Sequence, residues 1–341
     1  MSGFSSAYLH TRLSIFANRL IRLPRLLALI DLDLERILSN VNAITGRHYE
    51  LDLAYDDRIE NQLINHALED FRVLIRPFSG AERRFFHFAI RWFELVNLKV
   101  LIRGKFTATD SSEIQQRLIN LGNFADLPNK KLLETDDPYE MLRLLETTDY
   151  ASIVRQARHV YEEQGNDLFL LDATIDRSFF IDLHRRTCFL KASDAEHLRQ
   201  VMGGMMDRFN LLWLLRFRFS YGLSPAKSFY LLTSVGNKLN SVELMRLAKL
   251  DNFEAVIAAL PEAYQSLLAN VETISDIEIV MEYYSLAIAA DTLRNSTSLV
   301  SRVFSYILLR EAEVRFLQAL IKGKQLGFDS ALIKLAVGAV D

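Results

Sequence analysis

The sequence contains Glu94-x-x-Asn97-Leu98-x-x-Leu101-Ile102-Arg103-x-Lys105 and repeats this pattern twice further along the chain. The second copy is Asp207-x-x-Asn210-Leu211-x-x-Leu214-Leu215-Arg216-x-Arg218, and the third is Glu313-x-x-Phe316-Leu317-x-x-Leu320-Ile321-Lys322-x-Lys324. Each copy opens with an acid, continues with apolar residues at offsets four, seven and eight, and closes with two cations. The copies begin roughly 110 residues apart, which is typical of homologous domains rather than of a short solenoid repeat. The sequence therefore predicts a triplicated chain.

The spacing within each copy predicts a helix with one buried side, because offsets four, seven and eight lie along one face. We expect the leading acid toward the positive end of its helix segment and the trailing cations toward the negative end, where the macrodipole stabilises both. Asn97 and Asn210 are expected to satisfy backbone groups of a neighbouring helix. Gly104 and Gly323, between the cations, are expected to allow a close helix crossing or a left-handed cap.

Composition agrees with a large helical protein. Half of the 341 residues are hydrophobic, and only 13 glycines and 6 prolines are present, fewer than a chain of many strands and turns needs. No convincing period-two strand longer than a few residues occurs, so we predict an all-α fold. The best linkers lie at 122–138 and near 235–237, which predicts three similar helical domains at 1–126, 127–238 and 239–341.

A second pattern accompanies the first. Short amphipathic helices end at Tyr49, Tyr150 and Tyr264, and each tyrosine is followed by the next acid roughly 50 residues further on. The same order of tyrosine and acid, at similar distances along the sequence in all three cases, supports the triplication.

Four stretches also carry a family resemblance. They read Phe93-Glu94-x-x-Asn97-Leu98-Lys99-x-Leu101-Ile102-Arg103-Gly104-Lys105, Tyr306-Ile307-x-x-Arg310-Glu311-Ala312-Glu313, Leu145-x-x-Thr148-Asp149-Tyr150 and, near the start, Tyr8-x-x-x-Arg12. Together with the length of the chain, they resemble the C/d subunit of rotary V-type and archaeal-type (A-type) ATPases. Two positions depart from the family pattern: Phe316 stands where Asn is usual, and Phe217 stands where the other two copies have Gly.

The resemblance implies three helical domains in a pseudo-threefold, funnel-shaped arrangement. Such a protein sits on the cytoplasmic face of the membrane, peripheral to it, against the proteolipid rotor ring. Its cavity receives the foot of the central stalk, and it transmits torque without chemistry, so that ATP hydrolysis or synthesis is coupled to transport of protons or sodium. The resemblance implies no cofactor, no metal and no catalytic residue in this chain.

The repeated pattern supplies the candidate interface residues. We expect its cations to form a polar set near the socket or the ring face, whereas each one could instead be exposed or paired within the chain. These cations are Arg103, Lys105, Arg216, Arg218, Lys322 and Lys324. The acid and amide positions complete the candidate set, namely Glu94, Asn97, Asp207, Asn210 and Glu313.

Other classes of function find less support. The pattern Asp56-Asp57-x-x-Glu60 is similar to the Asp-rich metal motifs of all-α prenyl-chain enzymes, but it has no second Asp-rich partner. The sequence has no P-loop and no dinucleotide fingerprint, and its net charge of −3 gives no overall attraction for nucleic acid. We expect no signal peptide and no membrane-spanning segment. The main alternative is a helical scaffold or adaptor protein unrelated to rotary ATPases.

Overall fold

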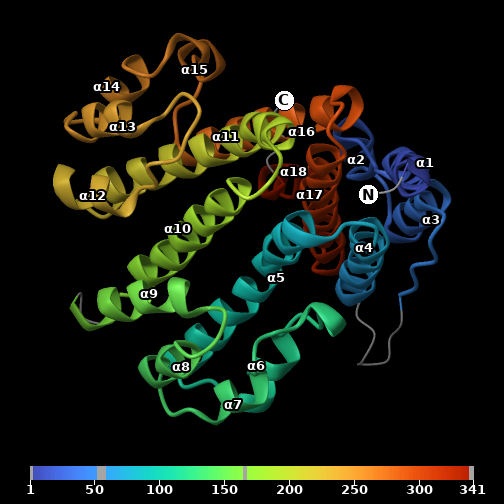
Figure 1. Cartoon of the computed structure of the whole chain (residues 1–341), viewed down its shortest axis with the longest axis horizontal. Helices are drawn as coiled ribbons and strands as arrows, with labels where there is room; N and C mark the ends of the chain where they lie inside the picture. The colour runs from blue at the N-terminus through green and yellow to red at the C-terminus, as the bar shows by residue number, and fades with distance from the viewer. Residues whose placement is uncertain (1–2, 52–58, 164–166, 338–341) are drawn as a thin grey trace. The chain divides into compact units, whose positions relative to one another are not determined.

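The computed structural model describes residues 3–51, 59–163 and 167–337, which form helices joined by turns and loops (Figure 1). No strand occurs in those ranges, which confirms the all-α prediction. Asp56 and Asp57 lie outside the described residues. The chain divides into two compact units, one made of the residues up to Arg83, Glu196–Val201 and the residues from Ser275, the other of Arg84–Ala195 and Met202–Ile274.

The first unit is built from both ends of the chain. Its helices are α1 (Gly3–Arg19), α2 (Leu23–Leu29), α3 (Leu34–Thr45), α4 (Ile59–Ile75), α16 (Ile274–Asn295), α17 (Leu299–Gln325) and α18 (Ser330–Ala336). The long helix α17 packs against α1, α3, α4 and α18, so helices from the two chain ends share one core. Leu63, Phe71 and Leu317 are fully buried in it.

The second unit holds the middle of the chain. Its helices are α5 (Gly80–Phe106), α6 (Ser111–Arg117), the 3₁₀ turn η1 (Gly122–Phe124), α7 (Asn129–Glu134), α8 (Pro138–Leu145), α9 (Ala151–Glu163), α10 (Leu168–Thr187), α11 (Ala192–Leu215), the π turn η2 (Arg216–Ser220), α12 (Pro225–Leu231), α13 (Ser241–Ala248), α14 (Phe253–Ala258) and α15 (Glu262–Leu267). Helix α9 packs against α8 and α10, and α12 packs against α10 and α13 (Figure 1). The aromatic residues Phe85, Phe86 and Phe88 are buried in the core of this unit.

The three long helices that carry the repeated pattern end in the same way. After α5, η2 and α17 the chain passes through a left-handed residue: Ala108 (φ 51°), Gly222 (φ 63°) and Gly327 (φ 75°). Glycine has no Cβ and adopts this conformation without strain, so two of the three turns use it. The next helix is then capped by a side chain that accepts a hydrogen bond from a backbone N–H of its first turn; the capping residues are Asp110, Ser224 and Asp329 respectively.

The two motif glycines allow the following helix to approach closely. A Cβ added at Gly104 would lie 2.4 Å from Ile114 Cδ1, and one added at Gly323 would lie 2.8 Å from Ile333 Cγ1. Each isoleucine is buried and stands ten residues after its glycine. The expected close crossing is therefore confirmed in both copies.

The second copy reaches the same packing with a different pair of residues. Phe217 replaces the glycine and is fully buried, and the corresponding position of the next helix carries the small, fully buried Ser228. The helix widens here into the π turn η2, against which α12 packs. In the second copy the large residue, Phe217, therefore stands on the motif helix, and the small one, Ser228, stands on the next helix. Ser228 follows Phe217 by one residue more than each isoleucine follows its glycine, and the π turn contains this extra residue.

Candidate functional site

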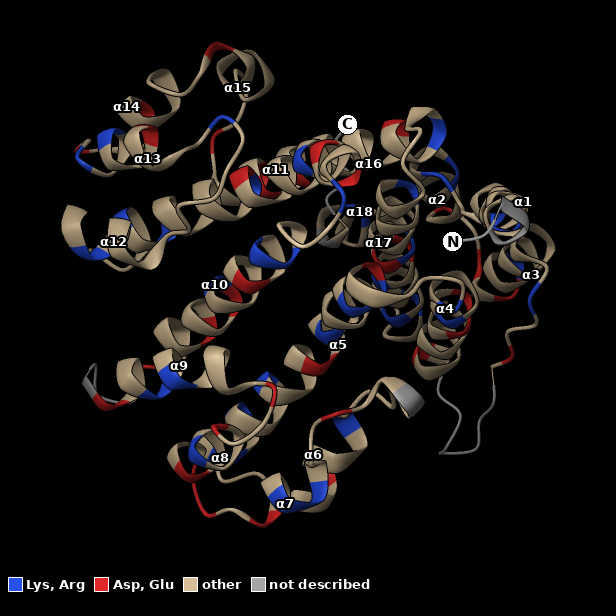
Figure 2. Ribbon diagram, viewed as in Figure 1, with Lys and Arg blue, Asp and Glu red and all other residues tan. Residues whose placement is uncertain are grey.

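The acid of each repeated pattern lies in the body of its helix, not near its start. Glu94, Asp207 and Glu313 are 1%, 0% and 2% exposed within α5, α11 and α17. Acidic positions along the bodies of α5, α10 and α11 are visible in Figure 2. The prediction that the acid complements the positive end of its helix is therefore wrong, because each helix begins well before the pattern. A carboxylate buried in this way requires polar partners.

Glu94 is held by a loop and by a tyrosine. Its Oε1 accepts the backbone N–H groups of Asp126, at 2.5 Å, and of Leu127, at 2.8 Å. Its Oε2 accepts a hydrogen bond from the Tyr150 hydroxyl. The Arg91 guanidinium lies 5.2 Å from the centroid of the Tyr150 ring. Burial raises the pKa of Glu94 to about 7, against the opposing effect of the two backbone donors.

Asp207 repeats this arrangement. Its oxygens accept the backbone N–H groups of three successive residues, Asn237 at 2.9 Å, Lys238 at 2.8 Å and Leu239 at 3.1 Å. Its Oδ2 also accepts a hydrogen bond of 2.6 Å from the Tyr264 hydroxyl. Burial raises the pKa of Asp207, and the hydrogen bonds oppose that rise. In both copies a buried carboxylate thus fastens a loop and a later tyrosine to the motif helix.

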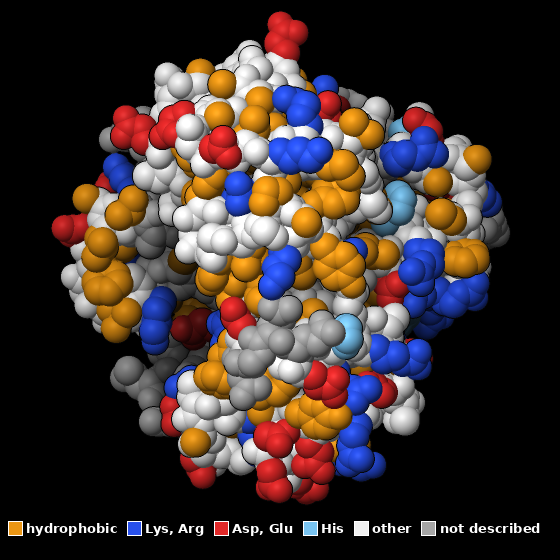
Figure 3. Space-filling model, turned by 90° about the vertical axis from the view of Figure 1, so that its left-hand side faces the viewer, with side chains coloured by type: hydrophobic (Ala, Val, Ile, Leu, Met, Phe, Trp, Pro, Cys, Tyr) orange, Lys and Arg blue, Asp and Glu red, His pale blue; other side chains and the backbone are white. Residues whose placement is uncertain are grey.

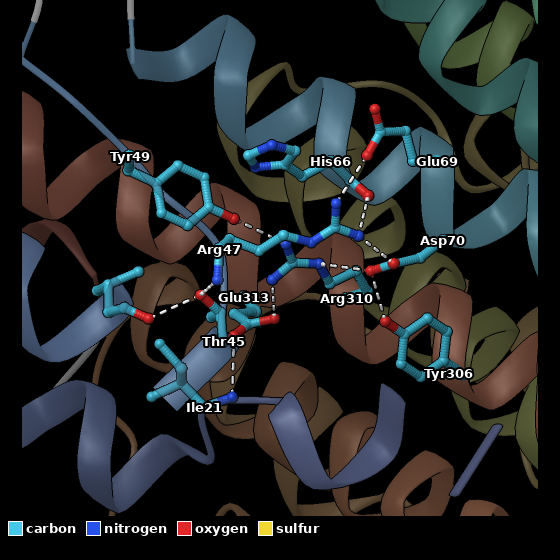
Figure 4. A network of polar contacts seen from close by, with 11 residues as sticks. Ile21, Thr45, Arg47, Tyr49, His66, Glu69, Asp70, Tyr306, Arg310 and Glu313 are labelled. Atoms are coloured by element: carbon cyan, nitrogen blue, oxygen red, sulfur yellow. Dashed lines mark hydrogen bonds and ion pairs between the residues drawn. The ribbon is translucent and has the colours of Figure 1, made fainter. Parts of the chain in front are cut away.

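Glu313 forms the third cluster with residues from the start of the chain (Figure 4). Its Oε1 accepts the backbone N–H of Ile21 at 2.9 Å, and its Oε2 lies 2.5 Å from Arg310 Nη1. Arg310 Nη2 in turn donates to the Tyr49 hydroxyl at 3.2 Å, so an arginine stands between the acid and the tyrosine. Burial raises the pKa of Glu313, opposed by the Arg310 charge. The N-terminal residues therefore complete the third copy of the arrangement.

Asp70 extends the third cluster from α4. It accepts hydrogen bonds from Arg47 Nη2, at 2.5 Å, and from the Tyr306 hydroxyl, at 2.9 Å, and it lies 3.8 Å from Arg310 Nε (Figure 4). Arg310, Glu313 and Asp70 are all less than 10% exposed. Since a buried charge is costly unless it is compensated, this network ties α4, α17 and the segment after α3 together only while every member is present.

The motif asparagines make a second clamp in two of the three copies. Asn97 exchanges two hydrogen bonds with the backbone of Ile119, of 2.7 and 2.8 Å. Asn210 accepts from the N–H of Thr233 at 2.9 Å and donates to its carbonyl oxygen at 3.2 Å. The expectation that these amides satisfy backbone groups is confirmed. Phe316, at the corresponding position of the third copy, is buried and makes no such clamp.

The cations of the first two copies interact within their own unit. Arg103 pairs with Asp172 although its side chain is 62% exposed, and Lys105 Nζ donates to the Leu133 carbonyl at 2.6 Å. Arg216 lies over the Trp213 ring, 5.6 Å from its centroid. Arg218 donates to the carbonyl oxygens of Leu223 and Leu250, at 2.7 and 3.2 Å.

The cations of the third copy differ. Lys322 is exposed and Lys324 is half-buried, both in the last turn of α17, and neither pairs with a carboxylate among the described residues. Within each copy, the acid is buried in the body of its helix and the cations lie near the end of that helix. On the face shown in Figure 3, basic and acidic side chains are interspersed, with hydrophobic side chains between them.

The described part of the chain contains neither a metal-binding cluster nor a membrane-length apolar helix. Within 3–51, 59–163 and 167–337, no group of three or more His, Cys, Asp or Glu residues is placed to hold a metal ion. Over the same ranges, no helix combines the length and the apolar character that a membrane crossing requires.

The sequence pattern did not assign the tyrosines, Arg91 or Arg310 to these clusters. A usable signal was present: Tyr150 follows Glu94 by 56 residues and Tyr264 follows Asp207 by 57. This acid-to-tyrosine spacing is more even than the tyrosine-to-acid spacing. It leaves Tyr49 without a preceding acid, and the structure places Tyr49 beside the last acid through Arg310.

Three buried carboxylate clusters, around Glu94, Asp207 and Glu313, thus fasten the motif helices to distant segments of the chain. This chain belongs to the ATP synthase (C/AC39) subunit family, whose sequence profile matches residues 9–335. It is thus a subunit of a rotary ATPase, which confirms that part of the expectation.

Curated relatives agree with the family. The chain is similar to the C subunit of the A-type ATP synthase of Methanocaldococcus jannaschii, at 25% identity over 78% of this chain and 68% of the relative. It is similar to the protein of the same name from Halorubrum lacusprofundi, at 28% identity over 86% of this chain and 83% of the relative. The similarity to the protein of that name from Methanococcoides burtonii extends over 98% of this chain and 94% of the relative, at 22% identity.

Proposed function

We propose that this chain is a non-catalytic central-stalk subunit that couples the stalk of a rotary ATPase to its membrane proteolipid ring. The observation that carries the proposal is the family match over residues 9–335, nearly the whole chain. Relatives named as the C subunit of A-type ATP synthases match most of its length as well. In this role the chain links ATP hydrolysis or synthesis to transport of protons or sodium, and the chemistry takes place in other subunits.

The buried clusters support a mechanical role. A part that transmits torque must not yield internally, and each motif helix is fastened to a distant loop or chain segment through a buried carboxylate. We propose that the three copies correspond to three helical domains, 1–126, 127–238 and 239–341, arranged with pseudo-threefold symmetry as a funnel that receives the stalk foot. In this proposal the beginning of the chain packs against the last domain, which is supported by the contacts of Ile21 and Tyr49 in the Glu313 cluster.

We further propose that the protein lies on the cytoplasmic face of the membrane, peripheral to it, and that exposed motif cations contact its partners. Lys322 and Lys324 are the strongest candidates, because neither pairs with a carboxylate among the described residues. Arg103 retains an exposed guanidinium beside Asp172. The remaining motif cations already contact groups of their own unit, so a partner could bind them only beside those groups; they are Lys105, Arg216 and Arg218.

The test is purification of the tagged chain from its own cells in gentle detergent, with identification of the subunits that accompany it. The proposal predicts proteolipid-ring and central-stalk subunits, with ATPase activity in the complex and none in the isolated chain. Recovery of the chain alone, or with unrelated proteins, from cells that express the motor would reject the proposal in favour of an adaptor.

A charge-reversal pair adds residue-level information to the same assay. Lys322→Glu with Lys324→Glu should reduce recovery of the partners while circular dichroism shows unchanged helicity. Lys130→Glu with Lys131→Glu imposes the same change of charge on exposed residues of α7 and should not reduce recovery. Equal recovery from both pairs would remove Lys322 and Lys324 from the proposed interface.

A further inference from the structure

A cavity of about 750 Å³ lies inside the first unit, lined by α1, α2, α16, α17 and α18. Its size falls within the range of small-molecule binding sites, and most of its lining is apolar. The clusters around Glu94 and Asp207 belong to the other unit, so this cavity needs a separate explanation.

Small side chains on two long helices create the space. One side of α16 and one side of α17 line the cavity with residues at helical spacing, and alanines recur on both. On α16 these are Ile279, Tyr283, Leu286, Ala287 and Ala290, and on α17 they are Leu309, Ala312, Phe316 and Ala319. The volume of the cavity depends on these alanines, because larger side chains at the same positions would fill it.

The cavity coincides with the departure of the third copy from the repeated pattern. In the first two copies Asn97 and Asn210 hold a backbone segment against the motif helix. In the third copy Phe316 takes this position and lines the cavity instead. The amide clamp found in the other copies is therefore replaced here by an apolar wall.

Four arginines and three glutamates line the cavity, namely Arg22, Arg294, Arg302 and Arg315, and Glu278, Glu282 and Glu313. Glu282 pairs with Arg315, and Glu313 pairs with Arg310. Arg302 donates from Nε to the Leu293 carbonyl at 2.8 Å, and its Nη1 lies 2.8 Å from His10 Nδ1. No carboxylate among the described residues pairs with Arg302. Burial lowers the pKa of Arg302, which is the effect that an anion beside it would oppose.

We propose that this cavity binds a single-chain amphiphile with an anionic head, namely a long-chain carboxylate. Its hydrocarbon chain lies along the alanine-lined sides of α16 and α17, where burial of apolar area provides the driving force. Its carboxylate is held by Arg302, with Arg294 in the last turn of α16 as a second cation lining the same cavity.

The test is calorimetric titration of the full chain, purified without detergent, with dodecanoate below its micelle concentration. Dodecyl maltoside and dodecyltrimethylammonium carry the same hydrocarbon chain with neutral and cationic heads. We expect dodecanoate to bind with one site, and the other two to bind at least about tenfold more weakly. Arg302→Gln should weaken dodecanoate about tenfold and leave dodecyl maltoside unchanged.

Cavity-filling variants test the location. Ala290→Trp should abolish dodecanoate binding, and Ala312→Phe provides a second filling variant if the first does not fold. Ala28→Trp adds the same bulk to an exposed position of α2 outside the cavity lining and should bind as wild type does. The proposal is overturned if dodecanoate does not bind, if the three head groups bind equally, or if a folded filling variant binds like wild type.

Discussion

The wild-type chain should lose stability as the pH rises, because the buried Glu94 ionises. Glu94→Gln should not show this loss, because glutamine does not ionise. Burial raises the pKa of Glu94 from 4.5 to about 7 in the folded chain. The folded state therefore holds this proton more tightly than the unfolded state does. Its contribution to stability is complete below about pH 4.5 and is lost progressively as the pH rises to about 7.

The size of the effect follows from that difference. A rise of about 2.5 pK units corresponds to about 3 kcal/mol of unfolding free energy, because each unit contributes about 1.4 kcal/mol. Glutamine retains a carbonyl oxygen that can accept the N–H groups of Asp126 and Leu127, and its amide can donate to the Tyr150 oxygen. The variant should therefore gain about 3 kcal/mol relative to wild type between pH 5 and pH 8.

Urea unfolding followed by tryptophan fluorescence measures this difference. The chain has two tryptophans, so a Trp213→Phe background leaves Trp92, on the same helix as Glu94, as the reporter. Glu254→Gln removes an exposed carboxylate from α14 and should follow the wild-type pH dependence. If wild type and Glu94→Gln keep a constant stability difference from pH 5 to pH 8, the reasoning about this buried carboxyl is refuted.

Three further changes test the clusters and the helix packing by urea unfolding. Tyr264→Phe removes the donor to Asp207 and should cost about 1–3 kcal/mol; no measurable loss would show that this hydrogen bond does not contribute. Gly104→Ala should destabilise by about 1–3 kcal/mol because its Cβ would meet the Ile114 side chain. Addition of Ile114→Ala should recover part of that loss, so that strictly additive effects would contradict the close contact. Arg310→Met leaves the buried Glu313 without its cation and removes one of the two cations beside Asp70, so it should cost about 3–5 kcal/mol, whereas a stability equal to wild type would show that the network is dispensable.

The sequence predicted the helices and their apolar stripes well, because both follow from local periodicity. Offsets within Glu94 to Lys105 correctly identified Leu98, Leu101 and Ile102 as buried. The close crossings at Gly104 and Gly323 also followed from residue type. The three-domain division and the interface remain predictions.

The role of the acids could not be predicted in the same way. The order of acid and cations in the pattern predicts helix-dipole stabilisation for Glu94 and Asp207, whereas their actual partners lie 30 or more residues away and are mostly backbone N–H groups. Every residue except proline has a backbone N–H, so residue type does not indicate which N–H groups bind the carboxylate. The Tyr150 hydroxyl was visible as a residue, but pairing it with the preceding acid requires knowledge of which segments return to the motif helix.

The partners of Glu313 were harder still to find, since Ile21 precedes it by 292 residues. Only the tertiary structure brings the two ends of the chain into one unit.

The proposed coupling is tested most directly by ATP-driven ion transport in membrane vesicles from cells that lack this chain. The account predicts that ATP hydrolysis by the catalytic sector persists, that ion transport is lost, and that the purified chain restores transport when added back. Transport at the wild-type rate in vesicles lacking the chain would contradict the proposal that it links the stalk to the ring.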